Sequence, residues 1–142
     1  MSWLPRKTVI VPIDFSEDSF SAMDVAGEMV DDASHLHVVH VLPVLEPQDP
    51  GVIWRQIDDE GRSQHATEAM QKELAARGHE GVQVAIRFGN PGHEIAHYAE
   101  EVGAELIVAS SHGRSGLRHL LIGSAADRVV RLAKCPVLVL KK

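Results

Sequence analysis

The sequence predicts one α/β domain whose parallel sheet is covered by helices on both faces. Two observations support this fold class. Short apolar runs rich in β-branched residues alternate with longer segments of helical periodicity along the chain, and strands that alternate with helices form parallel sheets. The length of 142 residues suits a single domain whose core needs no disulfide or metal. We expect right-handed crossovers between the strands.

Five segments have the composition of strands. Residues 8–13 are apolar on both faces, which is typical of a buried parallel strand. Residues 105–109 have a strongly apolar centre, and residues 137–140 follow Pro136 at the end of the chain. The predicted strands are residues 8–13, 35–42, 82–88, 105–109 and 137–140.

Four segments between these runs are predicted to be helices. Ser16 is expected to cap the first helix, because Glu17 and Asp18 after it suit the positive end of a helix dipole. The buried stripe of this helix is predicted to comprise Phe20, Met23, Ala26, Met29 and Val30. A proline-rich connection then leads to the second helix, which is marked by Ala66, Met70, Leu74 and Arg77 and stops near Gly78. The other two helices are predicted over residues 93–102, after the turn Gly89-Asn90-Pro91-Gly92, and over residues 124–133.

The charge of the chain and its single cysteine restrict its partners and its setting. The formal net charge of −6 argues against nucleic acid or an anionic membrane as the main partner. No stretch of the sequence approaches the ~20 apolar residues of a membrane span, and residues 1–7 lack the apolar run of a signal peptide. Cys135 cannot form an internal disulfide, which fits a reducing cytosol. We therefore expect a cytoplasmic protein.

Two polar segments mark the ends of the first and fourth predicted strands. They are Asp14-Phe15-Ser16 and residues 110–116. Ligands of open parallel sheets bind beyond the carboxyl ends of the strands, where the strand order reverses. In the second segment, Gly113 and Gly116 let a ligand approach the main-chain amides closely, and successive amides can form an anion-binding nest.

Gly123 and Ser124 then open a helix whose first amides are unpaired and whose dipole favours an anion. Ser124 adds a hydroxyl, and Arg114 or Arg118 would add fixed positive charge. These features predict a phosphate-binding loop. Taken alone, the glycines leave a purely structural role equally open, because glycines commonly end strands and start helices, and Ser124 would then be no more than an N-cap.

The spacing of Gly113, Gly123 and Ser124 resembles the nucleotide loop of the universal stress protein family. Four separated motifs match that family in order, and the match covers the chain except the stretch near residues 43–62. The motifs are Val11-Pro12-Ile13-Asp14-Phe15-Ser16, Gly89-Asn90-Pro91, the loop Ser111-His112-Gly113-Arg114 with Leu121-Ile122-Gly123-Ser124-Ala125, and Pro136-Val137-Leu138-Val139. Residues 1–142 are accordingly expected to be one universal stress protein domain. The resemblance implies a Rossmann-like sheet with strand order 3-2-1-4-5 and a homodimer through the last strand, Val137–Leu140.

In ATP-binding members of that family, the loop reads Gly, two residues, Gly, nine residues, Gly, then Ser or Thr. Ser110 stands at the first position here, where it places a side chain close to the path of a nucleotide. The resemblance implies ATP, or ADP or AMP, with Mg²⁺ on the phosphates. It places Asp14 near the ribose or the metal-phosphate group, and the backbone of Val41 against adenine. The full set of implied binding residues is Pro12, Ile13, Asp14, Ser16, Val41, Ser110, Gly113, Arg114, Gly116, Gly123, Ser124 and Ala125. From the residues alone, Asp14 could merely stabilise a turn, and Val41 reads as ordinary core.

Three functions stay open at this stage. The first is an ATP-binding module with a regulatory role in the stress response. The second is a slow ATPase or phosphoryl-transfer enzyme, against which stand the absence of a Walker lysine and of a clear general base beside the loop; no catalytic residue is predicted. The third is a nucleotide-free dimeric interaction protein, which Ser110 favours. An apolar edge strand at Val137–Leu140 needs a cover in any case, and symmetric pairing would supply one.

Several histidines suggest metal chemistry that the pattern does not support. His93-Glu94-Ile95-Ala96-His97 has the spacing of a zinc-protease motif. Helical periodicity nevertheless places both histidines opposite the apolar face, so we expect them to face solvent. His35, His37 and His40 are interpreted as strand-end and packing residues, and no metal site is predicted.

Two further residues suggest covalent chemistry. Cys135 has no neighbouring motif and is interpreted as structural. Ser111 and His112 could be read as a nucleophile and its base, but chain neighbours need not point together and no G-x-S-x-G elbow surrounds them.

Overall fold

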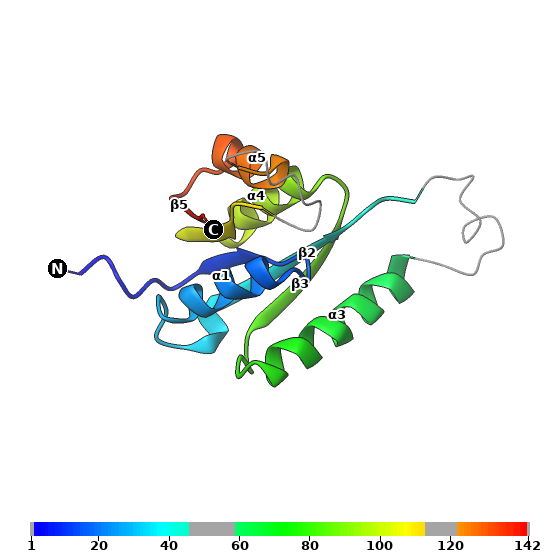
Figure 1. Cartoon of the computed structure of the whole chain (residues 1–142), viewed down its shortest axis with the longest axis horizontal. Helices are drawn as coiled ribbons and strands as arrows, with labels where there is room; N and C mark the ends of the chain where they lie inside the picture. The colour runs from blue at the N-terminus through cyan, green and yellow to red at the C-terminus, as the bar shows by residue number, and fades with distance from the viewer. Residues whose placement is uncertain (1, 46–58, 113–121, 142) are drawn as a thin grey trace.

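A computed structural model of the chain describes residues 2–45, 59–112 and 122–141 (Figure 1). Its five strands are all parallel and form one sheet in the order β3-β2-β1-β4-β5, which confirms the predicted order. The strands are β1 (Val9–Pro12), β2 (Leu36–Leu42), β3 (Gln83–Phe88), β4 (Leu106–Ser110) and β5 (Val137–Leu140).

Helices cover both faces of this sheet (Figure 1). In the described residues, α1 (Glu17–Gly27) and α3 (Asp59–Ala76) pack on one face, whereas α4 (Pro91–Val102) and α5 (Ser124–Leu132) pack on the other. A short 3₁₀ turn, Ala33–His35, leads into β2. No helix in these ranges is long and apolar enough to cross a membrane.

Strand residues alternate between two apolar cores, one on each face. Val9, Val11 and Ile13 pack with Phe20 and Met23 of α1, whereas Ile10 packs on the opposite face. β1 is therefore buried on both faces, as its apolar sequence predicts. The core on the face of α4 and α5 comprises Ile10, Val39, Ile95, Ala99, Ile107, Ala109 and Val129.

Two predicted helix boundaries differ from the structure. α4 begins at Pro91 rather than at residue 93, because the Asn90 side chain accepts a hydrogen bond from the His93 amide at 3.2 Å and proline suits the first turn. α1 ends at Gly27, so Met29 and Val30 lie beyond the helix, although both still pack against the core. α3 spans Asp59–Ala76; it contains Ala66, Met70 and Leu74 and ends near Gly78, as expected.

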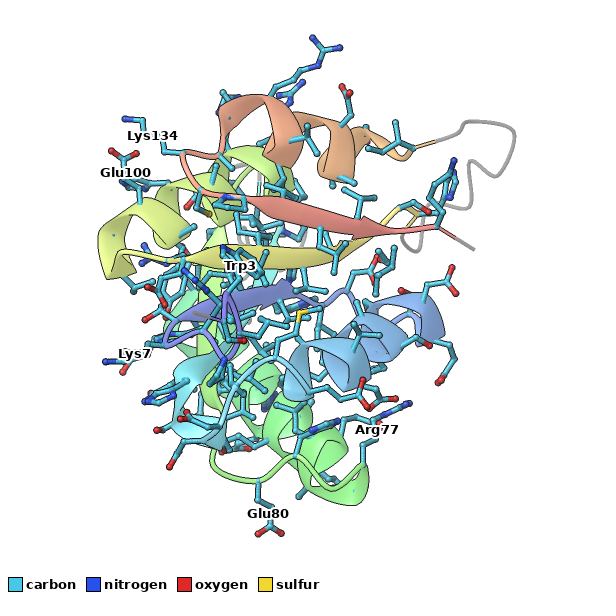
Figure 2. All side chains as sticks on the ribbon, turned by 90° about the vertical axis from the view of Figure 1, so that its left-hand side faces the viewer. Trp3, Lys7, Arg77, Glu80, Glu100 and Lys134 are labelled. Atoms are coloured by element: carbon cyan, nitrogen blue, oxygen red, sulfur yellow. The ribbon has the colours of Figure 1, made fainter. Side chains whose placement is uncertain are left out.

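α4 and α5 pack side by side on one face of the sheet. Both helices begin at the carboxyl edge of the sheet, because α4 follows β3, α5 follows β4 and all the strands are parallel. At their other ends, Lys134 Nζ lies 3.0 Å from Glu100 Oε1, and Figure 2 shows the two side chains together. This ion pair links the residues after α5 to α4.

His37 makes the stability of this face depend on pH. Its Nδ1 atom lies 2.8 Å from the Tyr98 hydroxyl, and burial lowers the pKa of His37. In the unfolded chain the same group takes up a proton near pH 6.5. Below that value the unfolded state therefore binds more protons than the folded state, and stability is lost as pH falls from 6.5 toward the lower folded pKa.

We expect the free energy of unfolding to decrease between pH 7 and pH 5, and His37→Gln to reduce that decrease. Urea denaturation at several pH values, on the wild type and the variant, measures both. His93→Gln, at an exposed position on α4, is the matched control. An unchanged pH dependence in His37→Gln would contradict this assignment.

Candidate functional site

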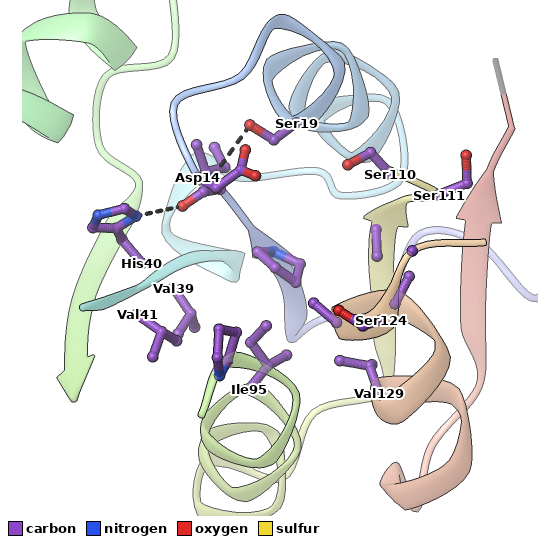
Figure 3. Close-up of a pocket in the computed structure, with 17 residues that line it drawn as sticks. Asp14, Ser19, Val39, His40, Val41, Ile95, Ser110, Ser111, Ser124 and Val129 are labelled. Carbon is purple, nitrogen blue, oxygen red and sulfur yellow. Dashed lines mark hydrogen bonds between the residues drawn. The ribbon is translucent and has the colours of Figure 1, made fainter. Parts of the chain in front are cut away.

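A pocket of about 250 Å³ opens at the carboxyl edge of the sheet (Figure 3). It lies where β1 and β4 are neighbours and their following helices, α1 and α5, lie on opposite faces. This is the switch point at which open α/β sheets bind ligands. Its described lining comprises Pro12, Ile13, Asp14, Ser19, Val39, His40, Val41, Pro91, Ile95, Ala109, Ser110, Ser111, Gly123, Ser124, Ala125, Ala126 and Val129.

One wall of the pocket is apolar. Figure 3 shows Ile95 of α4 and Val129 of α5 on the side opposite Asp14 and Ser19. Ile95 is 4% exposed and Val129 is 1% exposed, so the wall is part of the packed core. Val39 of β2 belongs to the same core. The pocket therefore offers an apolar slot to one end of a ligand and polar groups to the other.

The turn after β1 holds Asp14 in a fixed orientation. Its Oδ1 atom accepts hydrogen bonds from the Ser16 amide at 3.0 Å and from the Ser16 hydroxyl at 2.5 Å. The Asp14 amide donates to the Ser19 hydroxyl at 3.4 Å. Ser16 also caps α1 by accepting from the Ser19 amide at 3.2 Å. The predicted cap thus orients the carboxylate as well as starting the helix.

Phe15 carries backbone strain in the same turn. Its φ of 67° lies in the left-handed region, which is costly for a side chain of this size. Its ring packs edge-on against His40 with the centroids 4.9 Å apart. His40 Nδ1 lies 2.7 Å from the Ile13 carbonyl oxygen; since a carbonyl can only accept, Nδ1 carries the proton. His40 therefore anchors the turn from β2.

The residues directly after β4 are hydrogen-bonded to the residue before α5 and to β5. The Ser111 amide donates to the Leu140 carbonyl at 2.9 Å, and the Gly123 amide donates to the Ser111 carbonyl at 2.5 Å. A Cβ atom at Gly123 would lie 3.0 Å from the Ser111 oxygen, so glycine permits this close approach. The Ser110 hydroxyl donates to the His112 carbonyl at 3.1 Å. The serine that departs from the family's loop pattern is thus engaged within its own segment.

Among the described residues, no side chain caps the start of α5, unlike the starts of α1 and α4. Its N-cap is Gly123, which has no side chain, and the first helical hydrogen bond runs from the Asp127 amide to the Gly123 carbonyl at 2.9 Å. In the described structure, the amides of Ser124 and Ala125 therefore have no side-chain partner at this helix end. Both residues are exposed and line the pocket. Such a helix end favours a negative charge.

The register of β2 aims the main chain of Val41 at the pocket. The Val39 carbonyl accepts from the Ile13 amide at 3.0 Å, whereas the Leu42 carbonyl accepts from Gly89 on the opposite side at 2.9 Å. Because main-chain groups alternate in direction along a strand, Val41 faces the same side as Val39. The ladder between β1 and β2 ends at Pro12 and Val39 in the described structure. The amide and carbonyl of Val41 therefore face the space beyond β1.

The structure brings most of the predicted binding residues together. Eight of them line the pocket, and Ser16 stands behind Asp14 as its hydrogen-bond donor. Gly113, Arg114 and Gly116, like Arg118, lie outside the described residues. The eight lining residues are Pro12, Ile13, Asp14, Val41, Ser110, Gly123, Ser124 and Ala125.

The remaining lining residues were not expected from the sequence. Val39 could have been found from Val41, since strand residues two apart share a face. Pro91 and Ile95 reach the pocket from α4, which follows an edge strand, and no sequence signal places them there. The other lining residues not predicted are Ser19, His40, Ala109, Ser111, Ala126 and Val129.

The histidines on α4 and the single cysteine lie outside the pocket lining. His93 and His97 are exposed on α4, as expected, and His97 Nε2 lies 3.6 Å from Glu101 of the same helix. No group of three or more metal-binding side chains forms in the described ranges. Cys135 packs against the core on the face of α4 and α5, where burial raises the pKa of its thiol.

Ser111 and His112 do point together, which their sequence adjacency did not guarantee. The Ser111 hydroxyl lies 3.2 Å from His112 Nδ1. Ser111 is only 2% exposed, and its amide and carbonyl hold β5 and Gly123. These contacts give Ser111 a structural role at the base of the pocket.

Comparisons with known proteins agree on one family. Residues 5–141 match the universal stress protein family. The chain is 34% identical over 142 residues to universal stress protein MJ0531 of Methanocaldococcus jannaschii, covering 96% of this chain and 82% of that protein. It is also 34% identical over 146 residues to universal stress protein YxiE of Bacillus subtilis, covering 94% and 97%. The solved structure of protein MJ0577 of M. jannaschii superposes with a TM-score of 0.77 at 27% identity, covering 98% of each chain.

Proposed function

The chain belongs to the universal stress protein family, and from this premise we propose that its pocket binds an adenine nucleotide, ATP in particular, as a regulatory module. One observation carries the proposal. A single pocket joins an apolar slot, the outward-facing main chain of Val41 and the uncapped N-terminus of α5. The apolar slot suits the faces of a base, the main chain of Val41 suits the hydrogen-bonding edge of that base, and the start of α5 suits the phosphates of the nucleotide.

The apolar slot would hold the adenine ring. Ile95, Val129 and Val39 supply a buried surface for its faces. The amide of Val41 can donate to a ring nitrogen, and its carbonyl can accept from the exocyclic amine. A guanine would present a carbonyl oxygen in place of that amine, and two acceptors would then oppose one another. This arrangement favours adenine.

The phosphates would lie at the start of α5. The amides of Ser124 and Ala125 and the Ser124 hydroxyl provide donors at a helix end that favours negative charge. The Asp14 carboxylate would repel a bare phosphate, so it suits a ribose hydroxyl or a Mg²⁺ ion bound by phosphate oxygens. Mg²⁺ in nucleotide sites commonly takes one or two carboxylates besides the phosphates, and Asp14 fits that requirement.

Ser110, the residue that favours the nucleotide-free alternative, lines the pocket, and its hydroxyl is already engaged. Its hydroxyl bonds to the His112 carbonyl rather than standing free in the pocket. The proposed role is regulatory, because a bound nucleotide would join the turn before α1 to the start of α5. These elements lie on opposite faces of the sheet, and a ligand shifts a conformational balance by its differential affinity. Slow hydrolysis stays secondary, since no described feature favours it.

We expect Ala125→Glu to weaken ATP binding at least about tenfold, because the new carboxylate would stand where phosphates are proposed. Folding should be preserved, since Ala125 is exposed and a glutamate suits the first turn of a helix. Titration calorimetry with ATP and Mg²⁺ measures the affinity, and thermal melting measures the fold. Ala69→Glu, at an exposed site on α3, is the control. Equal ATP affinity in both variants, or no ATP binding by the wild type, would refute the proposal.

The protein is further proposed to be a homodimer paired along β5. Pro136 and Leu140 direct their carbonyls to β4, so the main chain of Val137 and Val139 faces outward. All four residues of β5 are partly exposed and apolar, which makes this edge a site for symmetric pairing.

Light scattering at micromolar concentration should therefore give the mass of a dimer. Val139→Pro should give a monomer with an unchanged fold, because it removes an outward-facing donor at an edge position that tolerates proline. Circular dichroism checks the fold of the variant. A monomeric wild type, or a variant that stays dimeric, would count against pairing through this edge.

A further inference from the structure

α4 and α5 meet at a glycine in the first turn of α4. A Cβ atom built on Gly92 of α4 would lie 2.5 Å from Cβ, 2.7 Å from Cγ and 2.9 Å from Cδ of Arg128. The aliphatic part of the Arg128 side chain therefore lies directly across Gly92, which is buried beneath it. Glycine weakens a helix relative to alanine, yet here it is the residue that leaves room for this side chain.

Arg128 lies one helical turn after residues that line the pocket. Long side chains of a helix lean toward its N-terminus, and α5 begins at the carboxyl edge, where the pocket opens. Ser124 and Ala125, one turn before Arg128, line the pocket. Pro91, the neighbour of Gly92, lines it as well. Arg128 is not itself part of the described lining, but a guanidinium that follows this lean would lie at the rim of the pocket between the two helices.

Arg128 also differs from its neighbouring cations in having no acidic partner among the described residues. Arg131 Nε lies 3.0 Å from Asp127, and Lys134 Nζ lies 3.0 Å from Glu100. Arg128 is exposed and makes no hydrogen bond or ion pair with any residue that the structure describes. Its charge is thus available to a ligand.

The pocket needs such a charge if it holds a phosphate. The described lining contains one carboxylate, Asp14, and neither lysine nor arginine. The whole chain carries a net charge of −6. Within the described lining, the amides at the start of α5 would have to offset this negative charge without a cationic side chain; Arg114 and Arg118 lie outside the described residues. A guanidinium at the rim would bind phosphate oxygens through two donors at once.

Resting on the proposed nucleotide site, we propose that Arg128, seated on Gly92, is the residue that selects phosphorylated ligands over the uncharged nucleoside. It contacts the phosphates and not the base. Its removal should therefore cost affinity for ATP while leaving the affinity for adenosine unchanged. Replacement by lysine keeps the charge but loses the paired donors, so Arg128→Lys should fall between the wild type and Arg128→Gln.

Calorimetric titration of ATP and of adenosine into the wild type, Arg128→Gln, Arg128→Lys and the control Arg131→Gln tests this assignment. We expect Arg128→Gln to lower the affinity for ATP about tenfold or more, with adenosine unaffected. The salt dependence of ATP binding should decrease in the same variant, because one charge contact is lost. Arg131→Gln should match the wild type for both ligands. Gly92→Ala should also weaken ATP binding, by displacing the side chain of Arg128.

The other outcomes separate this inference from the function on which it rests. If the wild type binds ATP and Arg128→Gln binds it equally well, Arg128 does not contact the phosphates. The inference is then wrong, while the proposed nucleotide site is unaffected. If Arg128→Gln weakens ATP and adenosine alike, Arg128 acts by packing on α4, and the inference is wrong. If the wild type binds neither ligand, the proposed function fails and the inference fails with it.

Discussion

The pocket exists because β1 and β4 are parallel neighbours while the helices that follow them lie on opposite faces of the sheet. The chain must part at this point, and no continuous layer of side chains can close the space between α1 and α5. Both cores contribute to this edge. β1 is buried on its two faces, and Val129 and Ile95 seal the pocket from the side of α4 and α5. The stability of the sheet and the shape of the site therefore depend on the same packed residues.

Local hydrogen bonds convert this opening into a site of defined polarity. His40 and Ser16 hold the turn that carries Asp14, and they do so from β2 and from the cap of α1. The strained backbone of Phe15 is kept in place by its contact with His40. Across the pocket, Gly123 lies so close to the Ser111 carbonyl that a Cβ atom there would make a tight contact of 3.0 Å. The Asp14 carboxylate and the start of α5 thus lie on different sides of one pocket.

Much of this architecture could be predicted from the sequence, for physical reasons that also explain the misses. Apolar periodicity located the elements, and the family resemblance supplied the strand order. The start of α4 was misplaced because Asn90 and Pro91, read as a turn, are the cap and first residue of the helix. Site residues at the ends of β1 and β4 were predicted because parallel strands present their carboxyl ends at one edge. Pro91, Ile95 and the contact between Gly92 and Arg128 could not be predicted, since they depend on how α4 packs against α5.

We propose that one adenine nucleotide contacts both the main chain of Val41 and the start of α5. Titration of ATP with Mg²⁺ into isotope-labelled protein, followed by amide NMR, can detect both contacts in one experiment. We expect the amide resonances of Val41, Ser124 and Ala125 to shift together with a single dissociation constant, while those in the middle of α3 stay in place. Unmoved resonances at all three positions with millimolar ATP would contradict it.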